Sequence, residues 1–253
     1  MGKIIAFAGK GGVGKTTVAA LVIRYLVGKG EGPILAVDAD PNSNLGETLG
    51  LEVTSTIGDI REDYMKDPQG VPSGMDKINY LQLLVEQALI EQRDFDLLVM
   101  GRQEGQGCYC MVNNILNDFT DKLSRNYKYL VVDNEAGMEH LSRRTSGLVD
   151  TLYLVTDYAL RGLRAVRRIN EMLPGLKLNV KQTGIIVTRA PEKLGDAFMA
   201  EAREIGLPIA ATIPNDPALL DFDMEKRSLL DLPADAPAVV AVDKMMAAML
   251  AQA

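Results

Sequence analysis

The segment Gly9-Lys10-Gly11-Gly12-Val13-Gly14-Lys15-Thr16 decides the fold class of this chain. It matches the phosphate-binding pattern G-x-x-x-x-G-K-[ST], in which glycines let successive backbone N–H groups turn toward phosphate oxygens. An apolar run at residues 3–8 precedes the segment, and an amphipathic run at residues 15–27 follows it, so a strand and a helix are expected to flank the loop. The sequence therefore predicts a nucleotide site on an α/β sheet.

The side chains of this phosphate-binding loop (P-loop) have separate predicted roles. Lys15 is predicted to be catalytic by neutralising the β- and γ-phosphates of ATP, and the Thr16 hydroxyl is predicted to bind Mg²⁺. The N-terminus of the following helix adds partial positive charge. The ATP-binding residues expected in the loop are Gly9, Lys10, Gly11, Gly12, Val13, Gly14, Lys15, Thr16 and Thr17.

Short apolar runs alternate with longer amphipathic runs along the 253 residues. This alternation is typical of βαβ units, and it predicts an α/β fold with a mostly parallel, twisted sheet and helices on both faces. Because no linker or repeat interrupts the pattern, we expect one P-loop domain over residues 1–253. Residues 54–74, rich in charge, Gly and Pro, are expected to form a mobile insertion. The seven predicted strands are residues 3–8, 34–38, 97–100, 129–133, 152–156, 184–188 and 209–213.

The composition excludes several classes of function. A net charge of −7 argues against a nucleic-acid partner. No apolar run approaches the roughly 20 residues of a transmembrane helix, and no secretory signal is recognisable, so we expect a cytoplasmic protein with no membrane partner. The chain has two cysteines and one histidine, His140. Any metal site other than that of the nucleotide must therefore use the cysteines or carboxylates.

Lys10 is the unusual residue of the loop, because an ordinary P-loop needs no second lysine there. The sequence K-G-G-V-G-K-T-T resembles the deviant Walker A ATPases, which include nitrogenase reductase, MinD, ParA-type partition ATPases and arsenite-pump-type ATPases. The resemblance implies an ATP-dependent homodimer in which Lys10 reaches the nucleotide of the partner subunit. There it would act like an arginine finger, and Lys10 is accordingly predicted to be catalytic.

Two later motifs resemble the switch segments of this family. The sequence D-A-D-P at residues 38–41 resembles switch I, which implies that Asp40 orients the attacking water and Asp38 supports Mg²⁺. Asp133 ends an apolar run and resembles the Walker B aspartate near Mg²⁺, and Asp133 with Gly137 resembles the D-x-x-x-G of switch II. Carboxylates at the carboxyl ends of parallel strands lie where such sheets bind ligands. A turn-forming or helix-capping role is the alternative for Asp38 and Asp40.

The family also binds adenine with residues that follow two late strands. In this chain those positions are Thr188 and Arg189 after one strand, and Pro214 and Asn215 after the next. Family members often carry Asn where this chain has Thr188, so the sequence departs from the family pattern at that position.

The segment Gly105-Gln106-Gly107-Cys108-Tyr109-Cys110 distinguishes the chain from most of these relatives. Two thiolates leave a four-coordinate ion half satisfied, whereas a two-fold dimer would supply four sulfurs. A helix expected to begin near Met111 would lower the pKa of the thiols through its N-terminus. Buried structural cysteines and a redox-active pair are the alternatives.

The P-loop, D-A-D-P, G-Q-G-C-Y-C and D-N-E-A-G-M-E-H-L-S-R-R together resemble the CooC-type nickel-inserting ATPases and the similar AcsF-type factors. The resemblance implies an ATP-hydrolysing metallochaperone that serves carbon monoxide dehydrogenase or acetyl-CoA synthase. It implies that Cys108 and Cys110 of two subunits bind one Ni²⁺, although four thiolates also suit Zn²⁺. ATP and metal would both promote the homodimer. An iron–sulfur carrier or nitrogenase-reductase-like ATPase is the alternative, followed by a MinD- or ParA-type positioning ATPase.

Overall fold

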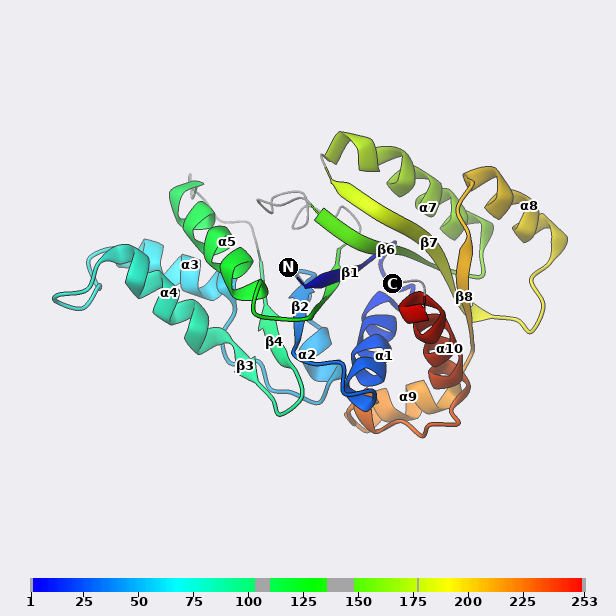
Figure 1. Ribbon diagram of the computed structural model, residues 1–253, viewed down its shortest axis with the longest axis horizontal. Coiled ribbons are helices and arrows are strands. Elements are labelled where there is room, and N and C mark those ends of the chain that lie inside the picture. The colour runs from blue at the N-terminus through cyan, green and yellow to red at the C-terminus, as the bar shows by residue number, and fades with distance from the viewer. Residues whose placement is uncertain (1, 103–109, 136–147, 177, 252–253) are drawn as a thin grey trace.

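The computed structural model describes residues 2–102, 110–135, 148–176 and 178–251, and an eight-stranded sheet forms its centre. The strand order is β3-β4-β2-β5-β1-β6-β7-β8, and every neighbouring pair is parallel except β3 with β4 (Figure 1). The strands are β1 Lys3–Ala8, β2 Ile34–Ala39, β3 Ile90–Glu91, β4 Asp96–Val99, β5 Tyr129–Asn134, β6 Leu148–Asp157, β7 Asn179–Ala190 and β8 Ile209–Pro214.

The predicted α/β fold with a mostly parallel sheet is confirmed, and each of the seven predicted strands is present. The count differs by one because β3, which has two residues at the sheet edge, is too short to show a periodic pattern. Strand β7 is also longer than predicted. Its first residues, Asn179–Thr183, are polar except for Val180 and are at least partly exposed, so no apolar run marks them.

Helices cover both faces of the sheet (Figure 1). Helices α3, α4, α5, α7 and α8 pack on one face, and α1, α2, α9 and α10 pack on the other. No helix in the described part of the chain is long and apolar enough to cross a membrane. The helices are α1 Lys15–Gly28, α2 Leu45–Thr48, α3 Ile57–Lys66, α4 Lys77–Ala88, α5 Cys110–Ser124, α7 Leu160–Met172, α8 Asp196–Ile205, α9 Pro217–Met224 and α10 Pro237–Ala251, with 3₁₀ turns η1 Leu173–Leu176 and η2 Leu229–Asp231.

Strand β1 shows why the predicted strands read as continuous apolar runs. Ile4, Ala6 and Ala8 point into the core under α7 and α8, whereas Ile5 and Phe7 point into the core under α1 and α10. All five side chains are almost fully buried. A strand buried on both faces has no polar face to alternate with, as expected in the centre of a parallel sheet.

Residues 54–74 contain a helix that the sequence analysis did not predict. Helix α3 begins with a capping box, in which the Thr56 hydroxyl accepts a hydrogen bond from the Asp59 N–H and the Asp59 carboxylate accepts one from the Thr56 N–H. Ile57, Ile60 and Tyr64 bury one face of this helix against the sheet core. Charged residues lie between these apolar positions, so the apolar face was not recognised from the sequence.

Candidate nucleotide-binding site

The P-loop joins β1 to α1 at the carboxyl edge of the sheet, as predicted. Gly14 caps α1 with a φ of 88°, a left-handed conformation that favours glycine. Gly9 is required for a different reason, because a Cβ atom there would lie 2.2 Å from the carbonyl oxygen of Val155 on β6. The loop therefore depends on glycine for both its turn and its close packing.

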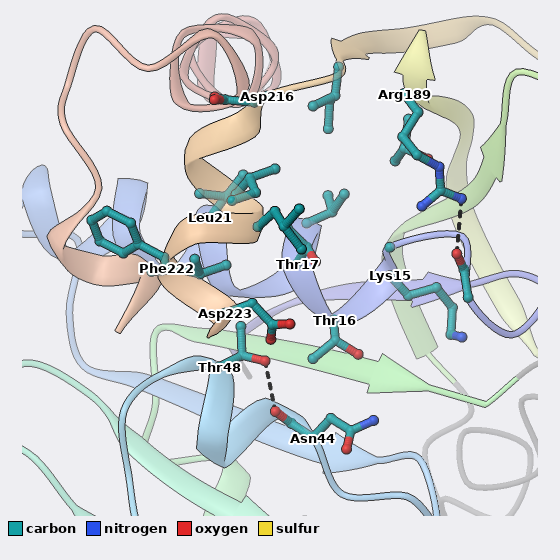
Figure 2. A pocket seen from close by; sticks show the side chains of 18 of the residues that line it. Lys15, Thr16, Thr17, Leu21, Asn44, Thr48, Arg189, Asp216, Phe222 and Asp223 are labelled. Carbon is teal, nitrogen blue, oxygen red and sulfur yellow. Dashed lines mark hydrogen bonds between the residues drawn. The ribbon is translucent and has the colours of Figure 1, made fainter. Parts of the chain in front are cut away.

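A cleft of about 740 Å³ opens beside the P-loop. Figure 2 shows Lys15 on one side of this cleft and Phe222 of α9 on the other. Such a volume is in the range of small-molecule sites. The cleft brings together eleven of the predicted site residues, which are Gly11, Gly12, Gly14, Lys15, Thr16, Thr17, Asp40, Thr188, Arg189, Pro214 and Asn215.

Lys15 and Asp40 face each other in this cleft. The Lys15 side chain is 6% exposed, and its Nζ lies 4.0 Å from Oδ2 of Asp40. The other Asp40 oxygen, Oδ1, accepts hydrogen bonds from the backbone N–H and the side-chain amide of Asn42, at 3.0 and 2.8 Å. Asn42 thus fixes the orientation of Asp40. This role of Asn42 was not predicted from the sequence, although D-x-N spacing is a signal for such a turn.

The Thr16 hydroxyl and the Asp133 carboxylate lie next to each other beside the P-loop. The Thr16 hydroxyl donates to Oδ2 of Asp133 at 2.6 Å, whereas the buried Oδ1 has no hydrogen-bond partner among the described residues. Burial raises the pKa of Asp133 to about 7, and the nearby charge of Asp38 adds to this effect. A hydroxyl beside a carboxylate with an unused oxygen is a donor set that suits Mg²⁺. The two residues therefore fit the predicted magnesium site.

Asp38 lies beside Asp133 on the neighbouring strand and is fully buried. Its two carboxylate oxygens accept hydrogen bonds from the N–H groups of Asp40, at 3.2 Å, and Leu45, at 2.8 Å. Burial raises the pKa of Asp38 to about 6. These contacts give Asp38 the turn-forming role of the alternative interpretation, because they shape the segment that carries Asp40. Its support of Mg²⁺ stays a prediction.

Thr188 and Arg189 line the cleft but contact the P-loop. The Thr188 hydroxyl donates to the carbonyl oxygen of Val13 at 2.7 Å and lies 3.2 Å from that of Thr156. The Arg189 guanidinium donates to the carbonyl oxygen of Gly12 at 2.9 Å. Neither contact involves the position of a base, so the adenine role of the two residues stays a prediction.

Helix α9 supplies the apolar side of the cleft, and the sequence analysis did not predict this contribution. Leu219 and Phe222 lie there with Leu21 of α1. Asp216 fixes the position of α9, because its carboxylate accepts hydrogen bonds from Ala218 N at the start of α9 and from Ala238 N at the start of α10. The sequence N-D-P before α9 is a helix-start signal, but only the fold shows that this helix borders the nucleotide site.

The remaining predicted site residues lie outside this cleft. Lys10 is exposed, and Gly9 and Val13 are buried in the loop. Cys110 is the first residue of α5, close to the helix start expected near Met111. Cys108 and Gly137 lie outside the described residues, so the predicted cysteine site and switch II glycine stay predictions. Within the described ranges, no group of three or more His, Cys, Asp or Glu side chains could hold a metal ion.

Comparisons with known proteins agree with this site. The model of the CobQ/CobB/MinD/ParA nucleotide binding domain matches residues 4–229. An ATP-binding protein of Methanocaldococcus jannaschii is 42% identical over 91% of each chain. The carbon monoxide dehydrogenase accessory protein CooC of Rhodospirillum rubrum is 27% identical, over 90% of this chain and 89% of that protein.

The solved structures include the cell division ATPase MinD of Pyrococcus furiosus, which superposes with a TM-score of 0.71 and 20% identity over the whole of both chains. At that identity the likeness supports the fold alone. The match of the domain model over most of the chain, and the 42% identity to an ATP-binding protein, go further. This chain therefore belongs to the CobQ/CobB/MinD/ParA family of nucleotide-binding domains.

Proposed function

We propose that this chain is an ATP-hydrolysing metallochaperone that delivers nickel to carbon monoxide dehydrogenase or acetyl-CoA synthase. The observation that carries the proposal is the C-x-C pair, Cys108 and Cys110, in a chain whose P-loop has the additional Lys10. The similarity to a carbon monoxide dehydrogenase accessory protein over nine-tenths of both chains supports the same conclusion.

The residues of the cleft suit ATP hydrolysis. Lys15 is buried, so its charge is poorly screened and would act strongly on the β- and γ-phosphates. Asp40, held by Asn42, would orient the attacking water. Bound Mg²⁺, held by Thr16 and Asp133, would neutralise charge on the phosphates. In the nucleotide-free protein the Lys15 ammonium faces Asp40, and a phosphate that binds Lys15 would free that carboxylate for water.

The position of Lys10 supports a dimer that closes around ATP. Its side chain is exposed and does not contribute to the cleft of its own subunit, unlike Lys15. A lysine placed in this way is available to a second subunit. In trans, it would add positive charge to the partner's phosphates only when two subunits meet, which couples nucleotide binding to dimer formation.

The order of elements supports communication between the nucleotide and the cysteines. Helix α5 begins at Cys110, and the next element along the chain is β5, which carries Asp133. A change at Asp133 would reach the segment that bears the thiols through β5 and α5. We propose that ATP binding changes the geometry of four sulfurs contributed by two subunits, and that hydrolysis resets the dimer.

Delivery of nickel to a client enzyme tests this function. Nickel-free carbon monoxide dehydrogenase should gain activity when mixed anaerobically with ATP and the nickel-loaded protein, and the Cys108→Ala and Cys110→Ala variants should not activate it. Tyr109→Phe, which keeps both thiols, is the matched control and should activate normally. Equal activation by the cysteine variants would refute the proposal. A brown protein that absorbs at about 400 nm, as thiolate-bound iron clusters do, would instead favour an iron–sulfur carrier.

A further inference from the structure

The carboxyl end of β7 makes two hydrogen bonds to the backbone of the P-loop. Arg189 donates to the carbonyl oxygen of Gly12 at 2.9 Å, and Thr188 donates to that of Val13 at 2.7 Å. Figure 2 shows the Arg189 side chain extending to the loop with a dashed line at this contact. Thr188 is 6% exposed, so its hydroxyl bond is shielded from water. Two consecutive P-loop peptide groups are therefore held from β7.

Holding these carbonyl groups also fixes N–H groups that a phosphate needs. A trans peptide is planar, and its C=O and N–H point in opposite directions. The Gly12 carbonyl shares a peptide with the N–H of Val13, and the Val13 carbonyl shares one with the N–H of Gly14. Arg189 thus orients the N–H of Val13, and Thr188 orients that of Gly14, two donors in the middle of the phosphate-binding loop.

The backbone at Arg189 indicates that this contact is built into the fold. Arg189 has a φ of 48°, which costs a non-glycine residue roughly 1–3 kcal/mol unless the surroundings hold it there. The pairing of β7 with β8 is also irregular between Val187 and Ala190, on either side of Arg189. The guanidinium also lies 3.8 Å from Asp157 at the end of β6. A strained residue, a bulged strand and an ion pair all direct this side chain to the loop.

We propose that Thr188 and Arg189 are positioning residues that set the P-loop amides for phosphate before nucleotide arrives. The proposal rests on the nucleotide site and not on the metal delivery proposed above. It assigns Thr188 to the phosphates, through the loop, in place of the adenine contact that its position in the sequence implies. Because the hydroxyl already donates its proton to Val13, it could contact a base only by accepting a hydrogen bond.

Binding of three ligands separates the two roles of Thr188. ATP, GTP and inorganic tripolyphosphate share phosphates but differ in the base, or lack one. Thr188→Val keeps the side-chain shape and removes the hydroxyl, and we expect it to weaken all three ligands alike, by roughly threefold to tenfold, the equivalent of one hydrogen bond. Thr188→Ser keeps the hydroxyl and should restore binding. Thr183→Val, on the same strand but away from the loop, is the matched control.

The outcomes are distinct. A loss for ATP with unchanged tripolyphosphate affinity would mean that Thr188 contacts the base or ribose, and it would overturn the proposal, as would unchanged affinity for all three ligands. If Thr188→Val lowers the melting temperature strongly, Arg189→Ala carries the test, because that side chain is half exposed and its loss should spare the core. It should weaken the three ligands alike. These measurements contain no nickel. A negative result would therefore not contradict the proposed nickel delivery, which the client-enzyme experiment tests separately.

Discussion

At the scale of single residues, three carboxylates lie close together beside the P-loop, and the protein itself does not supply enough cations to balance them. Asp38 and Asp133 lie side by side on β2 and β5, both buried, and Asp40 directly follows β2. Burial raises the pKa of Asp38 to about 6 and that of Asp133 to about 7. Lys15 is the cation that faces them within the described cleft. A nucleotide with Mg²⁺ would complete this balance of charge.

Lys15→Ala should abolish ATP hydrolysis and most of the nucleotide affinity. The variant removes a buried cation from a cleft that must accept several negative charges, and we expect turnover to fall at least about a hundredfold. Steady-state phosphate release and calorimetry measure both effects. Lys193→Ala is the control, because it removes an exposed lysine that does not line the cleft. Turnover close to that of the unmodified protein would contradict the assigned role of Lys15.

Asp133→Asn should stabilise the nucleotide-free protein at pH 8. An unfolded aspartate ionises with a pKa of about 3.9, whereas the folded Asp133 ionises at about 7. The unfolded state therefore loses this proton first, and the carboxyl lowers the free energy of unfolding progressively between about pH 4 and pH 7 and fully above that.

Removing this carboxyl should raise the free energy of unfolding at pH 8 by about 1–4 kcal/mol, and the gain should vanish near pH 4. Urea unfolding at pH 4, 6 and 8 measures this, with the exposed Asp235→Asn as the control. A variant less stable than the unmodified protein at pH 8 would show that Asp133 is stabilised as a carboxylate.

At the scale of elements, the sequence predicted the helices and loops whose pattern lies within one continuous segment. Helix α1 was predicted to within one residue, because the glycine-rich loop precedes it and its apolar residues repeat every three to four positions. Six of the nine predicted P-loop residues also line one cleft. Helix α3 was missed because Arg61, Glu62 and Asp63 break the apolar pattern, although Thr56 and Asp59 are a helix-start signal.

Contacts between distant segments could not be predicted from the sequence. Thr188 and Val13 are 175 positions apart, and only the order of strands in the sheet brings them together. Asp216 likewise joins the starts of α9 and α10, because the chain between the two helices folds back to bring Ala238 to it. The resemblance to a family supplied positions near the nucleotide but not these contacts, because a motif names residues without their hydrogen-bond partners.

Thr56→Ala should lower the stability of the protein without changing its nucleotide affinity. The substitution removes the side-chain cap of α3, and we expect a loss of about 1 kcal/mol in the free energy of unfolding. Asp63→Ala, in the same helix, breaks only an exposed pair with Lys66 and should cost less than about 0.5 kcal/mol. Denaturant unfolding compares the two. A larger loss in Asp63→Ala would mean that the capping box does not hold α3.

At the scale of the whole molecule, the proposed function requires two copies of the chain. One subunit supplies the cleft for nucleotide, since the P-loop, Asp40 and α9 all come from the same chain. It supplies only two cysteines, which leaves a four-coordinate metal ion half satisfied. The exposed Lys10 at the P-loop and the metal site proposed for the cysteines therefore both favour the same two-fold dimer.

Lys10→Ala should bind nucleotide normally but fail to dimerise with ATP. Its side chain lies outside the cleft of its own subunit, so the loss should appear only when a partner is needed. Sedimentation with a non-hydrolysable ATP analogue measures this, and Lys66→Ala, an exposed lysine on α3, serves as the control. Normal dimerisation with normal hydrolysis would show that Lys10 is an ordinary surface lysine.

Native mass spectrometry of the nickel-loaded protein tests the shared metal site most directly. The protein is titrated anaerobically with Ni²⁺, with and without ATP, and the mass of each oligomer gives its metal content. We predict one nickel ion per dimer, no nickel on the monomer, and no binding by Cys108→Ala or Cys110→Ala, both of which should still bind ATP. Metal should also promote the dimer without nucleotide, because a ligand that binds only the dimer shifts that equilibrium by mass action. One ion per monomer, retained in a form that stays monomeric, would contradict the account.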